Sequence, residues 1–206
     1  MATLQLEQAT TSQEDDIMQF LLSDFLHREP LNEALGLSAA GCAPFFRHLL
    51  RKGLRSGNSM VIRDDKGQII ATHVASFLYR PTGSNNNNND GDNFQIEGDI
   101  QKIAGLLDRL DEQLFYIMIV SVSSNHQRQG IANRIMRNAE EQARSKGCQG
   151  LLAEATAHNS QKMFEKLGYE VIYELQHKDY LDEAGKQIIK CHDATDRAQL
   201  VFKRCS

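Results

Sequence analysis

Residues 115–132 read FYIMIVSVSSNHQRQGIA, and this stretch decides the fold. Its first part, Phe115 to Val122, is apolar on both faces of a strand, as is typical of a central strand buried on both sides. A polar loop follows and leads to Gly130. Directly after this glycine, apolar residues recur at helical spacing up to residue 146. The sequence therefore predicts a buried strand, a glycine turn and a helix in direct succession.

This junction has the chemical features of an anion-binding site. The first N–H groups of a helix lack partners within the helix and point outwards at the positive end of its dipole. Gly130 lets the backbone approach a phosphate, and Arg128 adds positive charge. The two better-known phosphate motifs, Gly-x-x-x-x-Gly-Lys-Ser/Thr and Gly-x-Gly-x-x-Gly, are absent from the sequence. A glycine at a helix start is by itself more often an ordinary turn than a ligand site.

The pattern in the rest of the chain predicts a mixed α/β fold. Helical periodicity also occurs at residues 12–27, 38–54, 99–114 and 161–167. Further strands are expected at residues 59–63, 68–78, 151–156, 169–177 and 200–203. The alternation of strand and helix after residue 115 requires at least one parallel crossover. The Asn-rich segment 81–98 has nothing to bury and is expected to be a flexible surface loop.

Composition and charge exclude several classes of function. With 206 residues, 41% of them hydrophobic and 24% charged, the chain fits a single domain. Its net charge is −4 and its cations form no block, so we expect no nucleic-acid partner. The longest apolar run covers about half of the ~20 residues that span a membrane, so no membrane segment is expected. Four cysteines lie far apart, which indicates no disulfide framework, no metal site and a reduced, cytoplasmic location.

Three motifs together resemble the GNAT superfamily of acetyltransferases. QRQGIA at residues 127–132 matches the superfamily signature Gln/Arg-x-x-Gly-x-Gly/Ala and lies, as there, between a strand and a helix. MFEKLGYE at residues 163–170 resembles the element Leu-Tyr-Glu-Lys-x-Gly-Phe. REPLN at residues 28–32 resembles the Asp-Glu-Pro-Leu-Asn segment of insect arylalkylamine N-acetyltransferases, a group that includes dopamine and agmatine N-acetyltransferase-like enzymes. The resemblance covers roughly residues 10–173 and leaves the Asn-rich segment outside.

The resemblance implies one N-acetyltransferase domain over residues 1–206, with acetyl-CoA as co-substrate and no metal. Its sheet would be mixed, mostly antiparallel and flanked by helices, and one parallel strand pair would splay apart to admit pantetheine. Main-chain groups that would contact pantetheine belong to Ile119, Val120 and Val122. The residues that would hold the pyrophosphate, mostly through backbone N–H groups, are Arg128, Gln129, Gly130, Ile131 and Ala132.

The acceptor implied by the resemblance is a small primary amine, which is almost fully protonated at neutral pH because its pKa is about 10.4. Acetyl transfer therefore needs a base, a donor for the developing oxyanion, and an acid for the departing thiolate. Glu29 is the candidate base, because it is the glutamate of REPLN and lies at the helix break that Pro30 favours. Glu33 could add to the attraction of the cationic amine. Without the motif, both would be read as solvated carboxylates at a helix boundary.

The general acid is less well defined. Phe164 stands where many members of the superfamily have a tyrosine, so a phenolic acid is not expected there. The arylalkylamine group has hydroxyl residues four positions apart, and Thr156 and Ser160 reproduce that spacing. Ser160 could reach the CoA sulfur, and it could also cap the short helix that follows, whereas Thr156 can equally be an ordinary strand end. A backbone N–H near Val122 is the expected oxyanion donor.

We weigh three functions. The first is an acetyl-CoA-dependent N-acetyltransferase of a small primary amine, with direct transfer in a ternary complex because no cysteine lies in the matched motifs. On the resemblance alone, arylalkylamines such as dopamine, tyramine, serotonin or tryptamine rank above agmatine or a polyamine. The alternatives are a protein or peptide N-acetyltransferase and a non-catalytic acyl-CoA-binding module. A monomer is favoured for all three.

Overall fold

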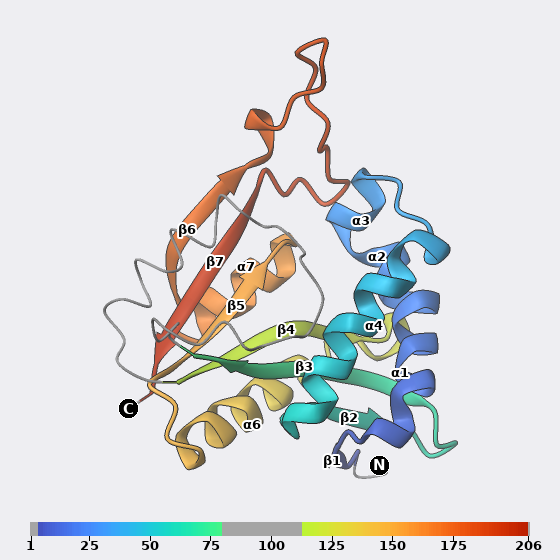
Figure 1. The fold of residues 1–206 in the computed structure, drawn as a ribbon, viewed down its shortest axis with the longest axis vertical. Helices are drawn as coiled ribbons and strands as arrows, with labels where there is room; N and C mark the ends of the chain where they lie inside the picture. The colour runs from blue at the N-terminus through green and yellow to red at the C-terminus, as the bar shows by residue number, and fades with distance from the viewer. Residues whose placement is uncertain (1–3, 80–112, 206) are drawn as a thin grey trace, which may run out of the picture.

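The computed structural model of the chain describes residues 4–79 and 113–205, and these form one seven-stranded sheet with helices on both faces (Figure 1). The sheet order is β1-β2-β3-β4-β5-β7-β6. Neighbouring strands are antiparallel except for β4 and β5, which are parallel. The strands are β1 (Leu6–Gln8), β2 (Met60–Arg63), β3 (Ile69–Leu78), β4 (Leu114–Val122), β5 (Gly150–Ala155), β6 (Glu170–Gln176) and β7 (Arg197–Arg204). This arrangement confirms the expected mixed, mostly antiparallel sheet with one parallel pair.

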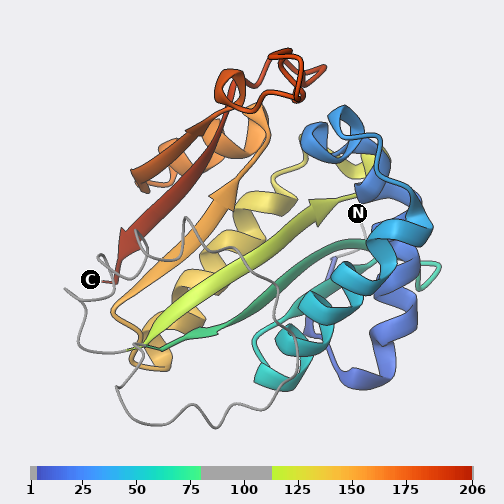
Figure 2. The same ribbon diagram turned by 45° about the horizontal axis from the view of Figure 1, so that its top comes forward.

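The helices fall into two layers (Figure 2). The described helices are α1 (Glu14–Phe20), α2 (Leu26–Arg28), α3 (Pro30–Ala34), α4 (Ala39–Ser56), α6 (Ile131–Ser145) and α7 (His158–Lys166). A π-helical turn, η2 (Leu21–Phe25), joins α1 to α2, and three short 3-10 turns are η1 (Thr11–Gln13), η3 (Ser124–His126) and η4 (His177–Asp179). Helices α1 and α4 cover one face of the sheet, and α6 and α7 pack on the other.

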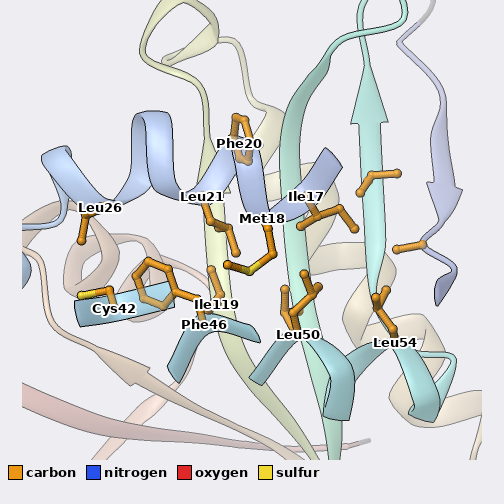
Figure 3. Close-up of a cluster of buried hydrophobic side chains, with 13 residues drawn as sticks. Ile17, Met18, Phe20, Leu21, Leu26, Cys42, Phe46, Leu50, Leu54 and Ile119 are labelled. Atoms are coloured by element: carbon orange, nitrogen blue, oxygen red, sulfur yellow. The ribbon is translucent and has the colours of Figure 1, made fainter. Parts of the chain in front are cut away.

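The two layers of helices have separate hydrophobic cores. On the first face, apolar side chains of α1 and α4, such as Ile17 and Leu50, pack around Ile119 of β4 (Figure 3). Val74 of β3 belongs to the same cluster. On the second face, Met136 of α6 belongs to a cluster with residues of β4, β5 and α7. Both faces of β4 are therefore buried, as its apolar sequence predicts.

Strand β4 carries an irregularity that opens the sheet. Its antiparallel pairing with β3 shifts at Met118, because Ile119 pairs with Val74 whereas Ile117 pairs with the next residue, Ala75. Such a bulge adds one unpaired residue, which bends the strand and exchanges its faces. The parallel pairing between β4 and β5 ends at Ile117, although β4 continues to Val122. The last part of β4 therefore separates from β5, which is the splay that the resemblance implies.

Several predicted boundaries shift in the structure. Helix α7 begins at His158 instead of residue 161, and β7 begins at Arg197 instead of residue 200. Leu114 begins strand β4 and is not the end of a helix. The rest of the predicted helix 99–114, and the Asn-rich loop 81–98, lie outside the described residues. The insertion of β7 between β5 and β6 was not predicted, because strand order along a chain does not specify order in a sheet.

Candidate active site between strands β4 and β5

Glu29 lies at the junction of α2 and α3, and its position follows from the residue after it. A proline disfavours helical geometry in the preceding residue and suits the first position of a new helix. Accordingly, Glu29 has an extended backbone (φ −74°, ψ 119°), and α3 starts at Pro30. As the N-cap of α3, Glu29 accepts a hydrogen bond on Oε2 from the backbone N–H of Asn32 at 2.7 Å. The residue is only 8% exposed, so its carboxylate is fixed and largely withdrawn from water.

Two charged residues attach this junction to the end of β4. Arg28 Nη2 donates to the backbone oxygen of Val122 at 2.8 Å, and its Nε donates to Asp24 Oδ2 at 3.0 Å. Asp24 Oδ1 in turn accepts from the backbone N–H of Ser124 at 3.4 Å, in the loop that follows β4. These contacts place Glu29 beside the part of β4 that has left β5.

The other side of the Glu29 carboxylate faces the end of β5. The hydroxyl of Thr156, the residue after this strand, is near enough to lower the pKa of Glu29. Burial is the larger effect and raises the pKa above its ordinary value of 4.5, and the charge of Asp193 adds to the rise. Glu29 Oε1 is buried without a hydrogen bond of good geometry among the described residues. A buried carboxylate with a raised pKa and a free oxygen has the properties of a general base.

A long connection between β6 and β7, residues 177–196, which we call the arm, supplies the remaining polar groups. Its residue His192 contacts Glu33 of α3, with 2.5 Å between Nδ1 and Oε2. Burial, followed by the charges of Asp193, Glu29 and Glu33, raises the pKa of Cys191 to about 11. Carboxylates from α3 and from the arm, far apart in sequence, thus converge around one thiol. Sequence reasoning missed the arm residues because they belong to no recognised motif.

Cys191 is not suited to nucleophilic catalysis in this environment. The thiolate is the reactive form of cysteine, and a pKa near 11 keeps the group protonated at neutral pH. Its sulfur lies 3.8 Å from Nδ1 of His177, but that nitrogen also lies 3.1 Å from the backbone oxygen of Thr195. The environment of Cys191 therefore opposes a covalent acetyl-enzyme on this residue.

The glycine turn before α6 fits a phosphate group. Gly130 has a left-handed backbone (φ +77°) at the N-cap of α6, and Arg128 nearby has φ +59°. A Cβ built on Gly130 would meet no atom within 4 Å, so the space above this residue is open. A groove of about 560 Å³ extends from Gly130 along α6, past Arg134 and Arg137. Backbone donors at a helix start, together with nearby guanidinium groups, form a donor set that suits a diphosphate.

The ladder between β3 and β4 determines which strand residues face the splay. The backbone N–H of Ser123 donates to Ile70 of β3 at 2.7 Å. Because main-chain groups alternate in direction along an antiparallel strand, those of Val120 and Val122 point away from β3. Ile119 pairs with Val74, so the alternation directs its main chain towards β3. Of the three strand residues singled out for pantetheine, Val120 and Val122 face the splay, and the Val122 oxygen already bonds Arg28.

Ser160 and Phe164 lie on α7, on the β5 side of the splay. Ser160 is the third residue of the helix and not its N-cap; its hydroxyl donates to the Ala157 oxygen at 2.8 Å and accepts from the Ala157 N–H at 3.2 Å. Phe164 is buried and packs edge-on against Tyr169, with 4.9 Å between ring centroids. Tyr169 is buried as well, and burial raises the pKa of its phenol. These two aromatic residues therefore belong to the core.

The described residues, 4–79 and 113–205, contain neither a metal site nor a membrane-spanning helix. No cluster of three or more His, Cys, Asp or Glu side chains suited to a metal occurs in these two ranges. Within the same ranges, no helix combines the length and apolar character that a membrane crossing requires. His73 of strand β3 is fully buried, with its Nε2 2.8 Å from the oxygen of Asn58.

Comparison with known proteins agrees with this geometry. Residues 41–169, more than half of the chain, match the sequence model of the acetyltransferase (GNAT) family. The chain therefore belongs to the GNAT acetyltransferase family.

Several solved structures share this fold. Arylalkylamine N-acetyltransferase 2 from Aedes aegypti is 24% identical, with a TM-score of 0.80 over 99% of this chain and 100% of that one. The Drosophila melanogaster polyamine N-acetyltransferase, which forms N-acetylagmatine, is 19% identical, with a TM-score of 0.70 over 98% and 100% of the two chains. The C-terminal condensation domain of Ebony, in complex with beta-alanyl-dopamine, is 14% identical, with a TM-score of 0.70 over 99% and 100%. At these identities the likeness establishes the fold.

Proposed function

We propose that this protein is an acetyl-CoA-dependent N-acetyltransferase that acetylates a small primary amine directly, with Glu29 as the general base. The observation that carries the proposal is the carboxylate of Glu29, buried at the splay of β4 and β5 with one oxygen free. The preceding residue, Arg28, donates to the backbone oxygen of Val122, and this contact holds Glu29 beside the end of β4. Burial raises its pKa, which suits proton abstraction near neutral pH.

Each part of the site has a role in this reaction. The N–H groups from Arg128 to Ala132 would hold the diphosphate, and the main chain of Val120 and Val122 would hold pantetheine. Bound acetyl-CoA supplies an activated acetyl group as a thioester. The negative charges of Glu29 and Asp193 attract the ammonium of the acceptor, and Glu29 removes its proton so that the amine becomes nucleophilic.

The groups around α7 complete the proposed chemistry. Thr156 faces Glu29 and contributes to the charge state of the base. Ser160 is the candidate donor to the departing sulfur, because its hydroxyl, which donates to the Ala157 oxygen, can rotate to donate to another acceptor. The Val122 N–H is the candidate donor to the oxyanion, since it points towards the splay by the alternation of the strand.

A cavity beside α3 favours an acceptor with an apolar body. It has a volume of about 300 Å³ and is lined by apolar side chains from α3 and the arm, including Leu31, Leu35, Tyr180 and Ile188. Leu31 is two residues from Glu29 on the same short helix. Most of the cavity's lining is apolar, with His177 and Tyr180 as its polar side chains, so a second cationic group placed there would lose water for a largely apolar environment. We therefore propose an arylalkylamine as the acceptor in preference to agmatine or a polyamine.

The experiment compares Glu29→Gln with Glu33→Gln, a carboxylate of the same helix that is half exposed and paired with His192. Thiol release from acetyl-CoA is measured with tyramine and with agmatine, and acetyl-CoA binding is measured by calorimetry. We expect Glu29→Gln to lose ~10²–10⁴-fold in kcat/KM while keeping its affinity for acetyl-CoA. Glu33→Gln should keep most of its activity, and the wild type should prefer tyramine.

The outcomes separate the three functions. Unchanged turnover in Glu29→Gln removes Glu29 as the base. Acetyl-CoA binding without turnover on either amine, or on peptides, by the wild type would instead identify a non-catalytic module. Turnover on peptides alone would assign the site to protein acetylation.

A further inference from the structure

The arm returns to the active site through Asp193. Asp193 Oδ2 accepts a hydrogen bond from the backbone N–H of His158, the first residue of α7, at 2.9 Å. Its Oδ1 accepts from the backbone N–H of Thr195 at 3.0 Å, which fixes the side chain from the arm's own backbone. Both carboxylate oxygens are therefore engaged, and the group has little freedom to turn away.

Asp193 replaces a cap that α7 cannot make for itself. The N-cap residue is Ala157, whose side chain has no acceptor for the free N–H groups of the first turn. Supplying the acceptor from the arm ties the start of α7 to residues about 35 positions later in the chain. Thr156 and Ser160 flank this point, so their hydroxyls are positioned by the same contact.

The Asp193 carboxylate also acts on Glu29 through its charge. Partial burial would raise the pKa of Asp193, but the hydrogen bonds from Thr195 and His158 outweigh it and hold the pKa below its usual range. Asp193 is therefore ionised throughout the neutral range. Its charge is one of the factors that raise the pKa of Glu29.

We infer that Asp193 is a positioning residue for acyl transfer, which docks the arm on α7 and holds a permanent negative charge beside Glu29. The inference rests on the proposed role of Glu29 as base. With this charge in place, Glu29 accepts a proton from the acceptor more readily, and the cationic amine is drawn to the splay. The two roles are separable, because capping needs only an acceptor oxygen whereas the second role needs the charge.

The remaining charged groups around Glu29 do not duplicate this effect. Glu33 of α3 contacts His192 and is half exposed. The guanidinium of Arg28 is turned towards Asp24 and Val122. Cys191 of the arm is protonated at neutral pH, and His177 lies beyond it, bonded to Thr195. Among the described residues, Asp193 is the charged group whose charge raises the pKa of Glu29.

The test is the pH dependence of kcat/KM for Asp193→Asn, which keeps an acceptor oxygen and removes the charge. We expect the acidic limb of the profile to move to lower pH, because losing a nearby anion lowers the pKa of Glu29. KM for the cationic amine should rise ~3–10-fold, while the affinity for acetyl-CoA stays unchanged. Asp196→Asn is the matched control, because Asp196 lies in the same arm but is exposed and paired with Arg197.

If Asp193 has only a structural role, Asp193→Asn will lower the activity in proportion to the loss of folded protein, and the acidic limb of the pH profile will not move. That result would overturn the inference. If Asp193→Asn does not fold, Asp193→Ser, which retains a capping oxygen, is measured in the same way. Activity retained in Glu29→Gln would refute the base itself. A lost activity in Glu29→Gln together with an unmoved limb in Asp193→Asn would refute only the role of Asp193.

Discussion

At the scale of single residues, the candidate site contains a carboxylate that is withdrawn from water. Glu29 is almost fully buried, and its raised pKa means that the folded protein disfavours the charged form relative to the unfolded chain. Such a group lowers stability as the pH rises above the unfolded value of 4.5 and through the raised folded pKa. Below 4.5 both states are protonated, and the penalty disappears.

Glu29→Gln should therefore be more stable than the wild type at pH 8, and the difference should shrink to nothing near pH 4. Glutamine keeps an oxygen that can accept from Asn32, so the cap of α3 survives. Urea unfolding at the two pH values measures the difference. A Glu29→Gln protein that is less stable at pH 8 would mean that the ionised carboxylate stabilises the fold.

The sequence identified some of these residues and not others, for a physical reason. Glu29 was predicted as the base because it is the glutamate of a family motif and precedes a proline, and Thr156 was a candidate because of its spacing to Ser160; both roles stay predictions. The structure brings Glu29 and Thr156 together, although no local pattern connects residues so far apart in the chain. Asp193 and His192 belong to the arm and contact residues of α7 and α3. A contact between an irregular segment and a distant helix leaves no periodic signal in the sequence.

At the scale of elements, α4 lies unusually close to the sheet at Gly53. A Cβ built there would lie 2.5 Å from Cγ1 of Val74 and 2.7 Å from Oγ of Ser59, both of them buried. Alanine is favoured over glycine in a helix by ~1 kcal/mol, which works in the opposite direction. The contact is with a core side chain that cannot move freely, so we expect the clash to dominate.

Gly53→Ala should lower the free energy of unfolding by ~1–3 kcal/mol, as measured by urea denaturation. Lys52→Ala, at the exposed neighbouring position, should stay within ~0.5 kcal/mol of the wild type. A Gly53→Ala protein at least as stable as the wild type would show that α4 can move away from β3.

Elements with strong periodicity were predicted well, and the differences lie at their ends. Helix α4 was expected over residues 38–54 and occurs at Ala39–Ser56, between the Ser38 cap and Gly57 in a left-handed conformation. Helix α7 was expected from residue 161, with Ser160 as a possible cap, but it begins at His158, whose N–H is bonded by Asp193. A bulge in this strand was implied by the resemblance to the superfamily, and the structure places it at Met118. Strand alternation alone does not predict it, because a bulge depends on how two strands pair.

At the scale of the whole molecule, function depends on where two distant parts meet. The central sheet brings the glycine turn before α6 to one end of the splay, and α2, α3 and the arm close around the other. The fold class followed from the order of elements after residue 115. The placement of the arm could not be predicted in this way, because β7 lies between β5 and β6 in the sheet. Such strand pairing is not specified by any one segment of the sequence.

The most direct test of this account is a crystal structure of the protein with CoA bound. We predict the diphosphate within hydrogen-bonding distance of backbone N–H groups of residues 128–132, and the sulfur between β4 and β5 beside Glu29 and Ser160. A diphosphate bound elsewhere, or a sulfur remote from the Glu29 carboxylate, would contradict the proposed site and the chemistry assigned to it.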